Sequence, residues 1–71
     1  MQPSNPTPDE IRAAREAAGL TQAAAAALIW SSQRGWQKWE SGEREMHPAM
    51  LRLFRLLTGQ ERVQAKRAKT A

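Results

Sequence analysis

The chain has 71 residues and a net charge of +4 at pH 7, which fits one small domain. It contains no cysteine, which excludes disulfides and thiolate metal sites, and no apolar run reaches the roughly 20 residues of a membrane span. One histidine, no cysteine and no tyrosine leave neither a nucleophile–base pair nor a set of metal ligands. We therefore expect a cytoplasmic protein that is not an enzyme and uses no metal, cofactor, membrane or small-molecule ligand.

The positive charge lies in the C-terminal part of the chain. Residues 1–40 carry four basic and four acidic residues, whereas residues 41–71 carry seven basic and three acidic ones. A basic segment of this kind indicates a polyanionic partner, most often nucleic acid. The alternative is a solvated basic tail that aids solubility, and charge alone leaves both interpretations open.

The first predicted helix follows a short leader. Residues 1–6 are polar and proline-rich, and we expect them to be disordered. Thr7 is the expected N-cap, with Pro8 at the first helical position and Glu10 completing a capping box. Gly19 ends this helix.

A second and a third helix follow, each with its own hydroxyl cap. Thr21 precedes residues 22–29, which include five consecutive alanines, and Ser32 precedes residues 33–40. Trp36 and Trp39 lie three residues apart, which favours core packing over stacking on single-stranded nucleic acid. The opposite face of the third helix carries side chains that suit base edges in the DNA major groove, namely Gln33, Arg34, Gln37 and Lys38.

The fourth predicted helix is capped by His47 and runs from Pro48 to about Leu57. Its apolar residues cover more than half of the helix surface, which is more than one core face needs. We assign the surplus, Leu51 or Leu56, to contact with a second subunit. Residues 60–71 form a basic, weakly helical tail.

Together these elements predict an all-α fold, a compact bundle of four helices or five, with one domain over residues 7–59. The expected core comprises Ile11, Ala14, Leu20, Ala26, Ile29, Trp36, Trp39, Met50, Leu53, Phe54 and Leu57.

Several short sequence motifs, at characteristic spacing over residues 8–57, resemble the lambda-repressor-like (Cro/Xre) helix-turn-helix family. They are Gly19-Leu20-Thr21-Gln22, Ala25-Ala26, Ile29, Ser32, Trp36, Trp39-Glu40 and Gly42. The run from Trp39 to Arg44, with Met46-His47-Pro48, also resembles small phage and plasmid autoregulators such as anti-CRISPR-associated repressors.

The resemblance implies a role for individual side chains. The outward residues of the third helix would read bases, and an Arg15–Glu40 ion pair would hold the first and third helices together. Contacts to the DNA backbone would come from Gln22, Ser32, Ser41, Gly42 and Arg44.

The chain departs from the family at the turn after the second helix, where Trp30 replaces the usual glycine. A bulky residue there must avoid or tolerate a positive φ. We expect Trp30 to be exposed and to be a further candidate for a dimer interface.

The resemblance predicts a sequence-specific double-stranded DNA-binding repressor that binds an inverted repeat as a homodimer, often at its own promoter. One alternative is a DNA-binding antitoxin. Another is a protein-interaction module on the same fold, which acidic or apolar residues on the third helix would indicate.

Overall fold

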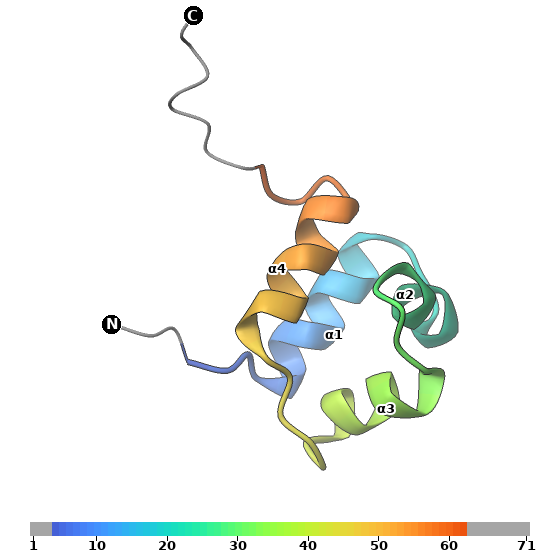
Figure 1. Cartoon of the computed structure of the whole chain (residues 1–71), viewed down its shortest axis with the longest axis vertical. Coiled ribbons are helices and arrows are strands. Elements are labelled where there is room, and N and C mark those ends of the chain that lie inside the picture. The colour runs from blue at the N-terminus through green and yellow to red at the C-terminus, as the bar shows by residue number, and fades with distance from the viewer. Residues whose placement is uncertain (1–3, 63–71) are drawn as a thin grey trace, which may run out of the picture.

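The computed structural model describes residues 4–62, and within them the chain forms four helices and no strand. In chain order these are α1 (Pro8–Ala17), α2 (Gln22–Leu28), α3 (Gln33–Ser41) and α4 (Pro48–Leu57). Figure 1 shows α1 and α4 running in the same direction, with α3 crossing near their N-terminal ends and α2 on one side. The predicted all-α fold is confirmed. Residues 1–3 of the expected leader and 63–71 of the expected tail lie outside the described residues.

All four helices begin at the residues that the local sequence predicts, because each has a side chain that accepts from its first free amide groups. Thr7 Oγ1 accepts from Glu10 N at 3.1 Å, and Glu10 Oε1 accepts from Thr7 N at 2.9 Å, which completes the capping box. The other three caps satisfy one amide each. They are Thr21, Ser32 and His47, the last accepting through Nδ1 from Ala49 N at 3.0 Å.

The core forms around Trp36 of α3, whose side chain is fully buried. Its ring centroid lies 5.1 Å from that of Phe54 on α4 and 5.6 Å from that of Trp39. Against these rings α2 places the small side chains of Ala25 and Ala26, which let the helices approach closely. The buried set as a whole is Ile11, Ala14, Ala25, Ala26, Ile29, Trp36, Trp39, Met46, Leu51 and Phe54.

The predicted inner face of α4 is confirmed at Phe54, which is fully buried, and wrong at three leucines. Leu51, assigned to a second subunit, is 3% exposed and belongs to the core, whereas Leu53 and Leu57, assigned to the core, are 36% and 51% exposed. The reason is that apolar side chains cover more than half of the α4 surface, so helical periodicity does not identify its inner face. Met46, from the loop before α4, fills core space instead.

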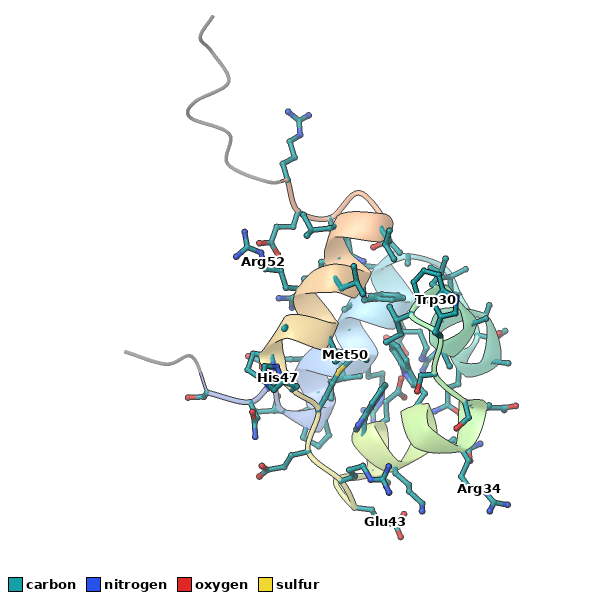
Figure 2. The ribbon with its side chains drawn as sticks, in the orientation of Figure 1. Trp30, Arg34, Glu43, His47, Met50 and Arg52 are labelled. Carbon is teal, nitrogen blue, oxygen red and sulfur yellow. The ribbon has the colours of Figure 1, made fainter. Side chains whose placement is uncertain are left out.

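The turn between α2 and α3 has an unusual backbone. Trp30 adopts a φ of 56°, in the left-handed region, and its side chain is 87% exposed. The turn is closed by Ser31 N, which donates to Ala26 O at 2.8 Å. Figure 2 shows Trp30 over α2, and the indole lies outside the core. The expected exposure of Trp30 is confirmed, and its backbone tolerates a positive φ rather than avoiding one.

Candidate nucleic-acid interface

Helix α3 separates its side chains into an inner and an outer face. Trp36, Trp39 and Glu40 are buried against the other helices. On the outer face the side chains predicted to read bases are exposed or, for the last one, half-buried, and Figure 2 shows Arg34 pointing away from the bundle. They are Gln33, Arg34, Gln37 and Lys38. All four therefore lie on one short, rigid element that faces solvent.

The N-terminal end of α3 is held by Ser32, whose Oγ accepts from Gly35 N at 3.0 Å. The hydroxyl keeps its own proton and can donate it to a phosphate oxygen. Gly35 lies close to two serines, since a Cβ there would sit 3.3 Å from the hydroxyl oxygens of Ser31 and Ser32. A larger residue at this position would have to displace the capping hydroxyl.

The C-terminal end of α3 leads into the loop expected to contact the DNA backbone. Gly42 ends the helix with a φ of 85°, and Ser41 Oγ donates to Lys38 O at 3.1 Å. Arg44 N donates to the same carbonyl at 3.2 Å, which fixes the start of the Arg44 side chain at the helix end. The arrangement brings exposed Ser41, Gly42 and Arg44 next to the outer face of α3.

Two glutamates in the same loop oppose binding of an anion. Glu43 is exposed at the tip of the loop, as Figure 2 shows. Glu45 accepts a hydrogen bond from Asn5 Nδ2 at 2.6 Å, which connects the leader to the loop. The sequence analysis gave these residues no role. Because they flank Arg44, the loop has a small net charge and its contribution to DNA affinity is limited.

Glu40 accepts hydrogen bonds from side chains of three helices. Arg15 of α1 donates through Nε to Oε2 at 2.6 Å and through Nη2 to Oε1 at 3.1 Å, so the predicted ion pair is present and bidentate. Gln22 of α2 donates to Oε1 at 3.1 Å, and the Trp36 indole Nε1 donates to Oε2 at 2.6 Å. A buried carboxylate with this many donors is fully satisfied.

The electrostatic state of Glu40 reflects a balance of burial and hydrogen bonding. Burial by itself raises the pKa of this carboxyl, but hydrogen bonds from Arg15, Trp36 and Gln22 outweigh burial and lower the pKa below its ordinary value. The hydrogen bond to Glu40 also raises the pKa of the Arg15 guanidinium. The pair is therefore charged at neutral pH.

Gln22 has a contact that the sequence analysis did not predict. It was expected to bind phosphate from the N-terminus of α2, and its half-buried amide instead donates to Glu40. The second N–H of the amide stays available for a phosphate. The Trp36–Glu40 contact has a sequence signal, because residues four apart share a helix face. The Gln22 contact joins residues 18 positions apart and has none.

The geometry agrees with comparisons to known proteins. Residues 11–58 match the helix-turn-helix family of the Cro/C1 type, and the chain belongs to that family. It therefore carries a DNA-binding helix-turn-helix domain. A stretch of 42 residues is also 45% identical to part of the Type II methyltransferase M.MspI of Moraxella sp, covering 59% of this chain and 10% of the relative. This chain thus spans only a small part of that relative.

Two other kinds of site were considered in the described part of the chain, residues 4–62. No helix there is long and apolar enough to cross a membrane. No three histidine or acidic side chains there come together in a way that could hold a metal ion.

Proposed function

We propose that this protein is a sequence-specific transcriptional repressor that binds double-stranded DNA with α3 in the major groove. The observation that carries the proposal is the division of α3 into a buried face, fixed by Trp36 and Glu40, and an outer face of exposed amide and guanidinium groups. A protein that reads base edges needs its contacting side chains held in fixed positions. The hydrogen bonds of Glu40 fix the position of α3 in the bundle and so meet this need.

The chemistry of the outer face suits direct readout of bases. Gln33 and Gln37 carry amides that can bond N6 and N7 of adenine, and Arg34 and Lys38 can donate to O6 and N7 of guanine. Contacts with phosphates would position α3, and they would come from groups around its two ends and from the start of α2. These are Gln22, Ser32, Ser41, Gly42 and Arg44.

We further propose that the operator is an inverted repeat bound by a homodimer. One helix-turn-helix reads few base pairs, so two half-sites about one helical turn apart are needed for useful specificity. Binding over a promoter would block access of polymerase, and the resemblance to small phage and plasmid autoregulators favours the protein's own promoter. Such a protein acts in the cytoplasm of a bacterial host, where the DNA lies.

The experiment is fluorescence-anisotropy titration against DNA from upstream of the protein's own gene, alongside sites selected from a random duplex pool. A scrambled duplex of equal length is the control. We expect the specific site to be preferred by at least about a thousandfold. Equal affinity for all duplexes would contradict the proposal.

A salt series on Arg44→Ala tests the assignment of positioning contacts. Each neutralised phosphate contributes about −0.9 to the slope of log affinity against log salt concentration. In a dimer the substitution removes Arg44 from both copies, so the slope should become less negative by roughly 1.8. Affinity for specific and scrambled DNA should fall alike. A loss confined to the specific site would instead place Arg44 among the base contacts.

A further inference from the structure

Trp30 combines two unfavourable features. A non-glycine residue in the left-handed region carries backbone strain, and a tryptophan that is 87% exposed leaves a large apolar surface in water. Neither feature helps the isolated domain, because the indole lies outside the core. A residue of this kind at a fixed turn indicates a contact with another molecule.

Helix α4 carries further exposed apolar side chains. Leu53 and Leu57 are 36% and 51% exposed, and Leu56 beside them is half-buried. Residues 53 and 57 are four apart and so share a helix face. Helices α2 and α4 pack together, and Trp30 follows two residues after the end of α2. We call Trp30, Leu53 and Leu57 the Trp30 patch.

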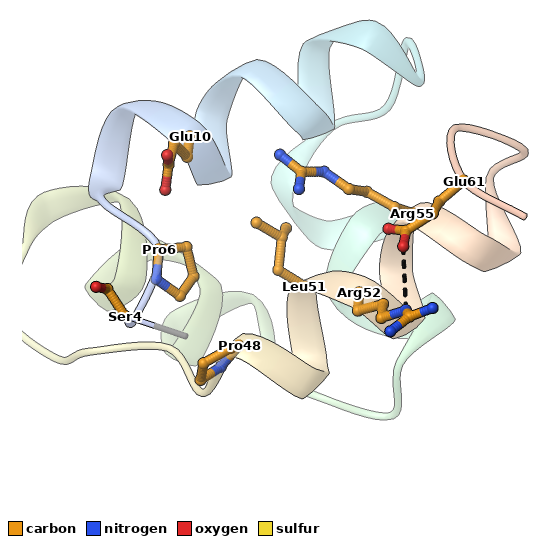
Figure 3. A pocket seen from close by; sticks show the side chains of 8 residues that line it. All are labelled: Ser4, Pro6, Glu10, Pro48, Leu51, Arg52, Arg55 and Glu61. Atoms are coloured by element: carbon orange, nitrogen blue, oxygen red, sulfur yellow. Dashed lines mark ion pairs between the residues drawn. The ribbon is translucent and has the colours of Figure 1, made fainter. Parts of the chain in front are cut away.

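The charge around the patch favours a second copy of this chain as the occupant. From Ala17 to Gln33, a stretch that includes all of α2, there is no charged residue. The opposite flank of α4 is charged, as Figure 3 shows, with Arg52 Nε 3.0 Å from Glu61 Oε2 beside a cavity of about 300 Å³. Across a two-fold axis the same surface patch faces itself, so an uncharged patch lets two chains of +4 approach without like charges facing each other.

The patch also leaves the reading face free. In Figures 1 and 2, α4 rises away from α3, and Arg34 points away from the side on which Trp30 lies. Two copies joined through the patch could therefore both present α3 to DNA. A partner that covered α3 itself would exclude DNA.

We propose that the Trp30 patch joins two copies of this protein on neighbouring half-sites of its operator. This inference rests on the proposed function and names the surface that function requires. With one exposed tryptophan, the patch offers roughly 300 Å² per copy, or about 600 Å² for two, which is less than the ~1,200 Å² of stable interfaces. The contact is therefore weak in free solution and becomes effective when DNA holds two copies at high local concentration.

The test compares two variants that add the same charge. Leu57→Arg puts a cation into the patch, and Ala13→Arg puts one on the exposed side of α1. Each raises the net charge to +5 and should strengthen non-specific attraction to DNA equally. Binding is measured by anisotropy on duplexes with one selected half-site and with the inverted repeat, after thermal melts show that both variants fold.

For wild-type protein and for Ala13→Arg, we expect affinity for the inverted repeat to be at least tenfold higher than two half-sites bound independently would give. For Leu57→Arg and for Trp30→Ser we expect independent occupancy within about twofold, with affinity for one half-site retained. Unchanged cooperativity in both patch variants would overturn the proposal. Wild-type binding that is specific but not cooperative would overturn it as well.

A measurement without DNA separates this proposal from the proposed function. NMR spectra of wild-type protein are recorded from about 20 μM to about 1 mM. We expect concentration-dependent shifts centred on the Trp30 indole and the methyl groups of Leu53 and Leu57, absent in Leu57→Arg. Spectra that do not change with concentration would overturn the self-contact even if DNA binding is specific. Shifts without any specific DNA binding would support the contact and contradict the repressor assignment.

Discussion

The two faces of α3 differ in what they do for the molecule. The inner face holds the fold, with Trp36 at the centre of the core and Glu40 linked to α1 and α2. The outer face contributes almost nothing to packing, because Gln33, Arg34 and Gln37 are exposed. One helix of nine residues thus carries both the main stabilising contacts and the proposed reading surface.

The difference implies that stability and DNA selectivity can be changed separately on the same helix. Substitutions on the inner face should lower the free energy of unfolding, and substitutions on the outer face should alter only base preference. Substitutions on each face, compared with each other, test this separation.

Replacing Trp36 by alanine should cause the largest loss. The side chain is fully buried, so Trp36→Ala leaves a cavity and should cost about 4 kcal/mol of stability. A chain of this length has a total stability of roughly 4–10 kcal/mol, so much of the variant should be unfolded. Urea unfolding followed by circular dichroism measures the loss. Gln37→Ala, on the adjacent outer position, is the control and should stay within about 0.5 kcal/mol of wild type.

Removing one partner of the Glu40 network should cost somewhat less. Arg15→Ala leaves a buried carboxylate without its bidentate cation and with only Arg12 Nε, 3.8 Å from Glu40 Oε1, as a nearby positive group, and we expect a loss of about 3 kcal/mol. Arg52→Ala is the matched control, because it breaks an ion pair whose arginine side chain is 56% exposed and should change stability by less than about 1 kcal/mol. Equal losses in the two variants would show that the buried Glu40 network stabilises the fold no more than the exposed Arg52–Glu61 ion pair does.

Acid should weaken the inner face in a predictable direction. Glu40 has a lower pKa in the folded chain than in the unfolded one, so its contribution is complete above the unfolded pKa and is lost as pH falls through the folded pKa. The free energy of unfolding should therefore decline below about pH 5, by less than the loss in Arg15→Ala. In Glu40→Gln the decline should be shallower. An identical decline in both proteins would assign the effect to other carboxylates.

On the outer face, Arg34→Ala should leave stability unchanged and reduce discrimination at one base pair by about 1–3 kcal/mol. Binding-site selection on the variant measures the change. Arg52→Ala again serves as the control, because it removes the same charge from another helix. If Arg34→Ala retains wild-type selectivity, Arg34 does not read a base.

Local features of the fold were predictable from the sequence, and the packing of α4 was not. Helix starts depend on a cap and the three residues after it, so Thr7, Thr21 and Ser32 identify them directly. The inner face of α4 depends on which leucines meet the rest of the bundle, and a helix whose apolar residues cover more than half of its surface does not identify them. Met46 lies in a loop, where no periodicity marks a core residue.

The site was predictable to a similar degree. The outer residues of α3 follow from helical spacing once Trp36 and Trp39 are assigned to the core, and the Arg15–Glu40 pair follows from the family resemblance. The contact of Gln22 with Glu40 depends on tertiary packing alone. The base sequence of the operator cannot be predicted from the amino-acid sequence, because glutamine and lysine can each bind more than one base edge.

The convergence of Arg15, Gln22 and Trp36 on one carboxylate has a consequence for how the domain opens. Each donor belongs to a different helix, so detaching any one of α1, α2 and α3 leaves a buried charge with fewer partners than it needs. These three helices should therefore separate together as one cooperative unit. Helix α4 has no donor in this network and is held to the bundle by apolar contacts, such as that of Phe54 with Trp36.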